Sequence, residues 1–555
     1  MYSCRISIGC KRTEINYLLR KRSDWGEGDS EREGETRERD AMNRRNSTLA
    51  KAVIFLFALN SLSLYLYFHP TRVNRPPLSV NSFLQADNLS LLADDSPSLS
   101  DLKPWPILPS YLPWWAGNST VRTHSCEAYF GNGFSQRHEV LRSRGGSGWF
   151  RCFFSETLRS SVCEGGRLRM LPERIKMSRG GERLEDVMGR GEDDEFPAFN
   201  DGAFEIEGGG GGRGEFGFGT GSGRKLVDGD FLNNYVPAGG ISRHTMRDLL
   251  GSIRIVGTKD FICDQWVEEP TLMVTRFEYA NLFHTITDWY SGYVSSRVTG
   301  LPSRPLVVFV DGHCKSPMEE TWKALFSGFS YAKSFNGSVC FRHAIFSPLG
   351  YETALFKGLS EHINCKGSGA HDLWKNPDDQ KTARLSEFGE MIRAVFGFPV
   401  NRHQQEKSWP VHSVLFVRRE DYLAHPRHSG KPESRLSNEQ EVFDAIKEWA
   451  SNHLACKINV VNGLFAHMSM KEQVQAIQDA SVIIGAHGAG LTHIITATSG
   501  TVIFEIISSL YRRPHFALIA QWKGLEYNAM NLAGSHASPA KVVDKLSDIM
   551  KGLGC

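Results

Sequence analysis

Residues 481–507, SVIIGAHGAGLTHIITATSGTVIFEII, decide which fold the C-terminal part of the chain can adopt. Residues 481–484 form a short run rich in β-branched side chains, which is typical of a buried parallel strand. A glycine-rich turn at 485–490 follows, then helical spacing at 491–497 and a second apolar strand at 501–507. In a doubly wound sheet, ligands bind at the carboxyl ends of the strands, against a helix N-terminus. This succession therefore predicts a ligand site at the turn.

The turn has the composition of an anion-binding site. Glycines let backbone N–H groups approach an anion, and the helix dipole favours negative charge. We expect Gly488, Ala489 and Gly490 to offer backbone contacts. His487 and His493 flank the turn and would add donors to a diphosphate. The alternative is that the glycines only let the helix pack closely on its strand.

Apolar strands alternate with helical patterns in two regions of the chain. The expected strands and helices are 271–275, 280–297, 306–310 and 318–326 in the first region, and 414–417, 438–450, 458–461 and 469–480 in the second. Such alternation predicts parallel sheets. We therefore expect an α/β protein with two Rossmann-like halves that face a cleft, one over residues 103–400 and one over residues 401–555.

An uncharged segment near the N-terminus predicts a membrane anchor. Residues 52–68, AVIFLFALNSLSLYLYF, are just long enough for a transmembrane helix and end in aromatic residues. No small-residue cleavage site follows, so we expect an uncleaved signal anchor rather than a cleaved signal peptide. The alternative is a helix buried in a protein core.

The segments on either side of this anchor differ in charge and composition. Lys and Arg are more frequent before the anchor than after it, which predicts a cytoplasmic tail over residues 1–51. Residues 1–41 have the composition of a disordered extension, and Met42 is an alternative start of translation. The Pro- and Ser-rich residues 69–102 are interpreted as a stem.

Charge and cysteine content limit the class of protein. The 64 basic and 62 acidic residues give a net charge of +2, which argues against a nucleic-acid surface. The cysteines beyond the anchor lack zinc-site spacing, so we expect disulfides in an oxidising compartment, with at least one thiol unpaired. A cysteine-rich region at 126–163 and a flexible Gly-rich insertion at 191–227 interrupt the first half. Three sequons are expected N-glycosylation sites: Asn88, Asn118 and Asn336.

The stretch RFEYANLFHTITD at 276–288 carries candidate acid–base groups. Asn281, His284 and Asp288 have the spacing of one helical face. Either His284 or Asp288 could remove a proton from an alcohol, and we prefer Asp288 because a carboxylate needs no tautomer fixed beforehand. Arg276 and Asn281 are expected to contact the acceptor. The alternative is that these polar groups only cap and brace the helix.

A second candidate set lies in the C-terminal half. Arg418 and Arg419 follow the strand at 414–417, at the same sheet edge as the glycine turn, so a guanidinium group would clamp a diphosphate. The alternative is a solvated ion-pair patch. Glu505 is an acid in an apolar strand, and it either bonds ribose hydroxyls or is satisfied internally.

Asp228 and Asp230 have the spacing that many sugar-nucleotide enzymes use to bind Mn²⁺. They adjoin the Gly-rich insertion and lack the rigid strand end that a metal site needs. We therefore expect no required metal or other cofactor.

Five stretches of the chain resemble plant members of glycosyltransferase family 61. They are KPWPILPSYLPW from 103, TRFEYANLFHTITDWY from 275, VVFVDGHC from 307, LFVRREDYLAHPRH from 415, and LFAHMSM with IQDASVIIGAHGAGLTH within 464–493. The resemblance implies a single-pass type II Golgi membrane enzyme with a GT-B-like pair of halves, the first on the acceptor side and the second binding the nucleotide sugar. It implies inverting transfer of xylose from UDP-xylose to O2 of the core β-mannose of N-glycans.

Two other functions fit the same motifs. One is a family-61 xylosyl- or arabinosyltransferase that acts on xylan. The other is a non-catalytic Golgi glycan-binding protein, against which the base candidates and the anion turn argue. The sequence leaves the disulfide pairing and the oligomeric state open.

Overall fold

The structure is a computed structural model of the chain. It describes residues 102–106, 108, 134, 136–143, 145–156, 158–208, 223–360, 383–400, 411–419 and 435–555. The expected tail, signal anchor and most of the stem lie outside these residues, as do Asn88 and Asn118. Within the described ranges, no helix has the length and apolar character needed to cross a membrane.

The C-terminal half is built on a five-stranded sheet in the order β17-β16-β18-β19-β20, with every neighbouring pair parallel. Its strands are β16 (Val411–Val417), β17 (Lys457–Gly463), β18 (Val482–Ala486), β19 (Val502–Ile507) and β20 (Glu526–Asn531). Its helices are α11 (Glu439–Asn452), α12 (Met470–Asp479), η8 (Ala489–Thr496), α13 (His515–Lys523) and α14 (Pro539–Gly552). The expected parallel α/β half is confirmed.

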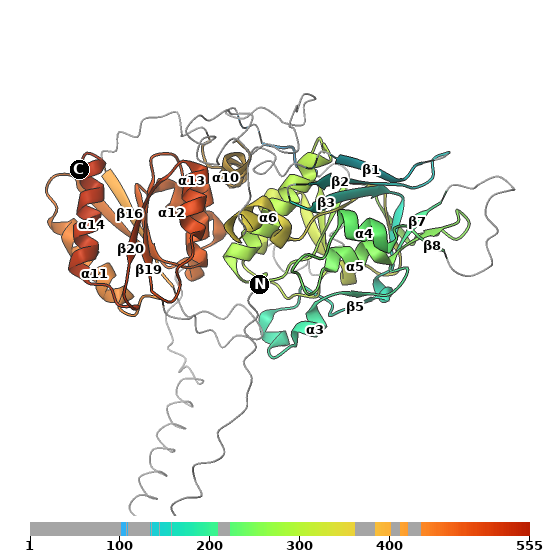
Figure 1. Cartoon of the computed structure of the whole chain (residues 1–555), viewed down its shortest axis with the longest axis horizontal. Coiled ribbons are helices and arrows are strands. Elements are labelled where there is room, and N and C mark those ends of the chain that lie inside the picture. Colours follow the sequence, from blue (N-terminus) through green and yellow to red (C-terminus); the bar gives the residue numbers. More distant parts are fainter. Residues whose placement is uncertain are drawn as a thin grey trace, which may run out of the picture. The chain divides into compact units, whose positions relative to one another are not determined.

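Helices cover both faces of this sheet because its strands are apolar on both sides. Val482 and Ile484 of β18 join a core with α11 and α14, whereas Ile483 joins a core with α12, η8 and α13. Figure 1 shows β19 and β20 between these two helical layers. A capping box of Ser469 and Glu472 starts α12, because each side chain satisfies a backbone N–H that the helix leaves open.

The first half has a mixed seven-stranded sheet in the order β1-β2-β3-β15-β11-β12-β13. The four strands from β15 to β13 are parallel, and β1 to β3 extend the sheet in antiparallel fashion. Its strands are β1 (Gln136–Leu141), β2 (Trp149–Ser155), β3 (Ser160–Gly166), β11 (Thr271–Val274), β12 (Leu306–Phe309), β13 (Gly328–Tyr331) and β15 (Ala344–Phe346). The expectation of a Rossmann-like half therefore describes only the parallel part.

A second mixed sheet, in the order β10-β14-β4-β7-β9-β8, packs against the first. Its strands are β4 (Leu168–Met170), β7 (Phe204–Glu207), β8 (Arg224–Lys225), β9 (Ile253–Val256), β10 (Gln265–Val267) and β14 (Val339–Phe341). The short strands β5 (Ile175–Lys176) and β6 (Ala198–Phe199) pair separately. Helices of this region are α3 (Glu192–Glu195), α4 (Gly229–Tyr235) and α5 (Thr245–Ser252).

The expected flexible insertion at 191–227 starts too early. Residues 192–207 form α3, β6 and the fully buried strand β7. Phe196, Phe204 and Ile206 are buried there, so this part has enough apolar surface to fold into the second sheet. Residues 209–222, which carry most of the glycines, lie outside the described ranges.

A single hydrophobic core runs from the first half into the second. Helix α6 (Leu282–Val298) packs against β11 and against η8, so the two sheets approach each other at this helix. Helix α10 (Ala383–Val395) adds Phe388 and Met391 to the same core. Arg393 on α10 donates to the carbonyl of Thr496 at 2.5 Å. This shared core places the N-terminus of α6 beside the glycine turn.

Disulfides are confirmed by three pairs: Cys152–Cys163, Cys263–Cys340 and Cys456–Cys555. The first joins β2 to β3 inside the cysteine-rich region, at directly opposed positions. Among the described residues, Cys314 is the free cysteine and it is buried, in line with the expected unpaired thiol.

Candidate active site

A cavity of about 380 Å³ lies where the start of α6 meets the glycine turn. Its wall combines aromatic rings, imidazoles, two guanidinium groups and turn backbone. The lining residues are Asn281, Phe283, His284, Phe356, Arg435, His487, Gly488, Ala489, Arg513, His515 and Phe516. They come from both halves, and none of them is a carboxylate. The predicted cleft is therefore positively charged or neutral on every side that these residues form.

The glycine turn enters the cavity through its first part. β18 ends at Ala486, Gly488 precedes η8, and both Gly488 and Ala489 line the cavity. A Cβ placed on Gly488 would lie 2.6 Å from Nη1 of Arg419, so a side chain there would displace that guanidinium group. Arg435 donates to the carbonyl of His487 at 3.2 Å and stacks on Tyr511. Backbone N–H groups and fixed cations thus surround one end of the cavity.

Gly490 has a different role from Gly488. Its added Cβ would lie 3.0 Å from Cγ1 of Val417, which belongs to the neighbouring strand β16. Gly490 does not line the cavity. Its small size lets η8 pack on the sheet, which is the structural alternative for this glycine. Of the three turn residues predicted to bind the donor, Gly488 and Ala489 line the cavity and Gly490 does not.

His487 is held by a buried carboxylate. Its Nδ1 lies 2.5 Å from Oε1 of Glu505, and the Tyr527 hydroxyl donates to Oε2 of the same carboxylate at 2.5 Å. Glu505 is fully buried, and both of its oxygens are occupied by protein groups. The expected hydrogen bond from Glu505 to a ribose is therefore wrong, because the side chain points at His487 instead of at the cavity.

His493 is a core residue rather than a donor-binding residue. Its Nε2 lies 2.7 Å from Oε1 of Gln473, and its ring packs edge-to-face on Phe465. Only 1% of the residue is exposed, and burial lowers its pKa to about 3. The helical spacing that follows the turn carries this side chain into the core, away from the cavity.

The N-terminus of α6 brings two predicted residues to the cavity. Asn281 caps the helix, because its Oδ1 accepts from the backbone N–H of Phe283 at 3.0 Å. His284 lies in the first turn of α6, and its Nδ1 has no hydrogen-bond partner among the described residues. Burial, with a smaller effect of nearby His515, lowers the pKa of His284 to about 4. Its imidazole is therefore neutral at neutral pH and can accept a proton.

Asp288 lies one turn further along α6 and does not line the cavity. The residue is only 4% exposed, and its carboxylate accepts from the backbone N–H of Gly350 in η5 (Gly350–Glu352). A Cβ on Gly350 would lie 2.3 Å from Oδ1, which shows how closely η5 covers this side chain. Burial raises the pKa of Asp288 well above its usual value, with a smaller contribution from Asp311. The position of Asp288 therefore argues against the expected role of this residue as the base.

Arg276 is part of a closed ion-pair network. Its guanidinium group donates to Asp311 at 2.7 Å and to Glu319 at 3.2 Å, and it stacks on Phe309 at 3.9 Å. The residue is 1% exposed and lies outside the cavity lining. The expected contact of Arg276 with an acceptor is therefore wrong in this fold, because its partners come from the neighbouring strand end and from α7 (Glu319–Leu325).

The consecutive arginines Arg418 and Arg419 have different contacts. Nε of Arg418 pairs with Glu439 at 3.4 Å, at the start of α11. Arg419 reaches Gly488 with its guanidinium group, as the added Cβ on that glycine indicates. Neither arginine is among the lining residues, but Arg419 supports the turn directly.

Six lining residues were not anticipated: Phe283, Phe356, Arg435, Arg513, His515 and Phe516. Arg513 and His515 follow β19, whose carboxyl end lies at the same sheet edge as the glycine turn. His515 stacks on Phe283 of α6 at 5.4 Å, and burial lowers its pKa to about 4. The rule that ligands bind at strand carboxyl ends would have pointed to RRPH at 512–515.

Of the two aspartates with metal-site spacing, Asp228 and Asp230, the first has a structural role. Asp228 caps α4, because its Oδ1 accepts from the backbone N–H of Phe231 at 2.8 Å. Among the described residues, His412, Cys456 and Cys555 are close enough to share an ion. The two cysteines form a disulfide, which removes the thiolates that a metal would need.

Comparisons with known proteins bear on this site. A family model described as Glycosyltransferase 61 matches residues 244–504. The beta-1,2-xylosyltransferase of Arabidopsis thaliana is 59% identical over 545 residues, covering 93% of this chain and 100% of that protein. A beta-1,2-xylosyltransferase of Oryza sativa subsp. japonica is 62% identical over 461 residues, covering 82% and 84%. An EGF domain-specific O-linked N-acetylglucosamine transferase of Gallus gallus is 24% identical over 279 residues, covering 48% and 45%.

Proposed function

The chain belongs to glycosyltransferase family 61, and we propose that it transfers xylose from UDP-xylose to O2 of the core β-mannose of N-glycans, with inversion at the sugar carbon. The similarity to two beta-1,2-xylosyltransferases over most of the chain supports this choice of sugar and acceptor. The observation that carries the proposal is the cavity between the halves, which pairs a neutral imidazole with a cationic glycine turn. The two halves on either side of it form a GT-B-like arrangement.

In this proposal, the diphosphate of the donor binds at the glycine turn. The backbone of Gly488 and Ala489 supplies N–H donors, while Arg435 and Arg513 supply charge. His487 adds a further donor, since Glu505 fixes its ring orientation. Such preorganised donors and cations stabilise the charge that develops on a departing diphosphate. These groups replace the charge that a divalent ion supplies elsewhere, so we expect no metal requirement.

His284 is the proposed general base. O2 of the mannose attacks C1 of the xylose while the bond from C1 to the β-phosphate oxygen breaks and leaves UDP. The hydroxyl proton passes to the neutral imidazole of His284, which lies on the half opposite the turn. General base catalysis of this kind contributes roughly two to four orders of magnitude in rate. Phe283, Phe356 and Phe516 would form apolar walls for the sugar rings.

We also propose that the enzyme is a type II protein of the Golgi membrane with a luminal catalytic part. The uncharged segment at 52–68 supports an anchor, and the disulfides support an oxidising compartment.

The deciding experiment offers the purified protein several donors and acceptors. Incubation with UDP-xylose and a GlcNAc-terminated N-glycan should raise the mass of the glycan by one pentose, and linkage analysis should place that pentose on O2 of the core mannose. Parallel reactions with UDP-GlcNAc, or with xylan oligosaccharides as acceptor, should give no product. Transfer to xylan but not to the N-glycan would refute the proposed acceptor, and no transfer in any reaction would refute the enzyme activity.

A further inference from the structure

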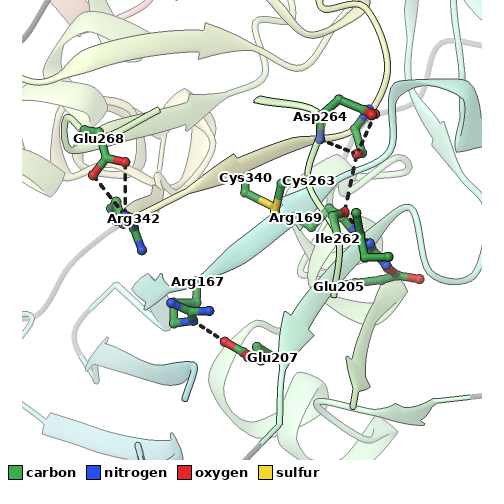
Figure 2. Close-up of a disulfide and its surroundings, with 11 residues drawn as sticks. Arg167, Arg169, Glu205, Glu207, Ile262, Cys263, Asp264, Glu268, Cys340 and Arg342 are labelled. Atoms are coloured by element: carbon green, nitrogen blue, oxygen red, sulfur yellow. Dashed lines mark hydrogen bonds and ion pairs between the residues drawn. A yellow bond between two sulfur atoms is a disulfide. The ribbon is translucent and has the colours of Figure 1, made fainter. Parts of the chain in front are cut away.

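The sequon at Asn336 belongs to a tight turn that is attached to a distant loop. The turn lies between η4 (Ala332–Ser334) and β14, and Asn336 itself is exposed. The loop Ile262–Asp264, just before β10, lies against it. Figure 2 shows this loop beside β14, with Cys263 joined to Cys340.

Ser338, the hydroxyl residue of the sequon, is bound on two sides by Asp264. Its hydroxyl and its backbone N–H both donate to Oδ2 of Asp264, at 2.8 and 2.6 Å. The backbone N–H of Asp264 lies 3.1 Å from the Ser338 hydroxyl oxygen and donates to it. These hydrogen bonds, from the side chain first and then the backbone, lower the pKa of Asp264, which keeps it ionised as an acceptor.

Gly337, the middle residue, makes the turn possible. Its φ is +77°, in the left-handed region that favours glycine, and an added Cβ would lie 2.5 Å from Oδ2 of Asp264. In this turn, Asp264 lies against Gly337 and binds Ser338, while Asn336 is exposed.

The Cys263–Cys340 disulfide keeps this arrangement closed. It joins residues separated by 77 positions and lies one residue from Asp264 and two from Ser338. On the same segments, β10 and β14 pair in parallel from Gln265 and Val339 onward. Opening the turn in the oxidised protein would therefore pull on the β10–β14 ladder, which begins directly after Asp264.

We propose that Asn336 accepts its oligosaccharide only before the Cys263–Cys340 disulfide closes. An oligosaccharyltransferase reads the hydroxyl of an Asn-x-Ser/Thr sequon, and in the closed turn that hydroxyl is already bound to Asp264. In the transfer, the Asn336 amide nitrogen loses a proton and bonds to C1 of the sugar, while the C1–oxygen bond to the lipid diphosphate breaks. Disulfide closure then passes two protons and two electrons from the thiols to a protein disulfide oxidant.

This order of events rests on the proposed luminal location of the chain, but the closed turn itself does not. Because Asn336 is exposed in the final fold, an oligosaccharide added earlier would stay outside the protein. Closure of the disulfide would then prevent further glycosylation of Asn336. The occupancy of the site would depend on whether glycosylation or disulfide closure is faster.

The test uses full-length protein that was made without N-glycosylation and then oxidised. Purified oligosaccharyltransferase and a lipid-linked oligosaccharide are added, and mass spectrometry measures the glycosylated fraction of the Asn336 peptide. The wild type should stay unmodified. Cys263→Ser leaves the sequon intact and should be modified, whereas the matched control Cys152→Ser removes a disulfide of the other sheet and should not be.

Two further measurements separate this inference from general unfolding and from the proposed function. Asp264→Ala keeps the disulfide, so it should raise the glycosylated fraction of the Asn336 peptide less than Cys263→Ser does. Xylosyl transfer to a free N-glycan is assayed on the same wild-type sample, so failure of that activity is seen independently of the Asn336 result. Modification of the oxidised wild type as fast as of Cys263→Ser, or equal modification of Cys152→Ser, would overturn the proposal.

Discussion

Two polar clusters lie near the carboxyl ends of parallel strands, one inside the first half and one where the two halves meet, and they differ in how far their side chains satisfy one another. The first, the Arg276 cluster, consists of Arg276, Asp311, Glu319 and Tyr331. It is buried, and its opposite charges are paired. The second, the cavity cluster, consists of His284, Arg435, His487, Arg513 and His515. It contains bases and cations but no carboxylate, and Nδ1 of His284 has no hydrogen-bond partner within the part of the chain that the structure describes.

Whether the side chains of a cluster are paired with one another distinguishes structural polar residues from functional ones. A buried charge has to be paired, so a closed network such as the Arg276 cluster stabilises one conformation of the protein. The cavity cluster instead places the cations Arg435 and Arg513 on a cavity whose lining residues include no carboxylate. The cavity cluster therefore fits an anionic ligand, and its members should respond to mutation through activity rather than through stability.

The largest expected effect is on turnover, at His284. His284→Gln should lower kcat by roughly two to four orders of magnitude, because the base is removed. The matched variant is Asp288→Asn, which should keep turnover close to the wild type because the raised pKa of Asp288 already favours the uncharged acid. Steady-state kinetics and UDP calorimetry on both variants test this. Loss of turnover in Asp288→Asn with retention in His284→Gln would reverse the two roles.

The next effect is on stability, at Arg276. Arg276→Met leaves Asp311 and Glu319 buried without their cation, so it should lower the free energy of unfolding by about 3–5 kcal/mol. Arg513→Met in the cavity cluster should leave stability unchanged and weaken UDP binding by roughly tenfold or more, the loss of one hydrogen bond to a charged group. Denaturant unfolding and calorimetry measure both. Equal stability losses in the two variants would remove the distinction between the clusters.

The pH dependence should also follow the cavity cluster. If His284 is the base, kcat/KM should fall as the pH decreases through about 4, because the protonated imidazole cannot accept a proton. Stability should fall over a wider range, from the ordinary histidine pKa of 6.5 down to about 4. Buried His284 and His515 bind protons more weakly in the folded than in the unfolded state, so stability is fully present above 6.5 and is lost as the pH decreases.

A pH profile of kcat/KM, measured beside an acid-unfolding curve, separates these two effects. A kinetic acid limb near 6.5 in protein that is still folded would show that the essential base is not His284.

Within the glycine turn, the same contrast should appear between two neighbouring glycines. Gly490→Val would press on Val417 of β16 and should cost about 1–3 kcal/mol of stability by overpacking. Gly488→Val should cost less stability, since the contact is with the end of a long side chain, but should weaken UDP binding because it displaces Arg419 from the turn that lines the cavity. Calorimetry with UDP distinguishes them. Unchanged UDP affinity in folded Gly488→Val would make the turn purely structural.

The smallest effect is expected at Asp228. Asp228→Ala removes the N-cap of α4 and should cost about 1 kcal/mol of stability with no change in turnover. Activity of the wild type should persist in excess EDTA. Activity that EDTA abolishes and Mn²⁺ restores would instead require a metal site, and Asp230→Asn would then be the variant to compare with Asp228→Ala.

Local sequence patterns were sufficient for the parallel C-terminal sheet and for the position of its ligand edge. The apolar runs, the glycine turn and the capping signals each lie within a short segment, so the pattern of that segment alone predicts a strand, a turn or a helix start. The positions of His284 and His487 on the cavity were also predictable, because each lies directly after a helix start or a strand end. The family resemblance added the expected chemistry.

Tertiary structure alone decided which neighbours of these residues reach the cavity. Asp288 is covered by η5, Arg276 is bound by Asp311 and Glu319, and Glu505 is bound by His487 and Tyr527. Those partners come from other strands and helices, so no spacing within the motifs could reveal them. Whether a polar side chain is catalytic or structural depends on burial and on pairing, and both are properties of segments that only folding brings together.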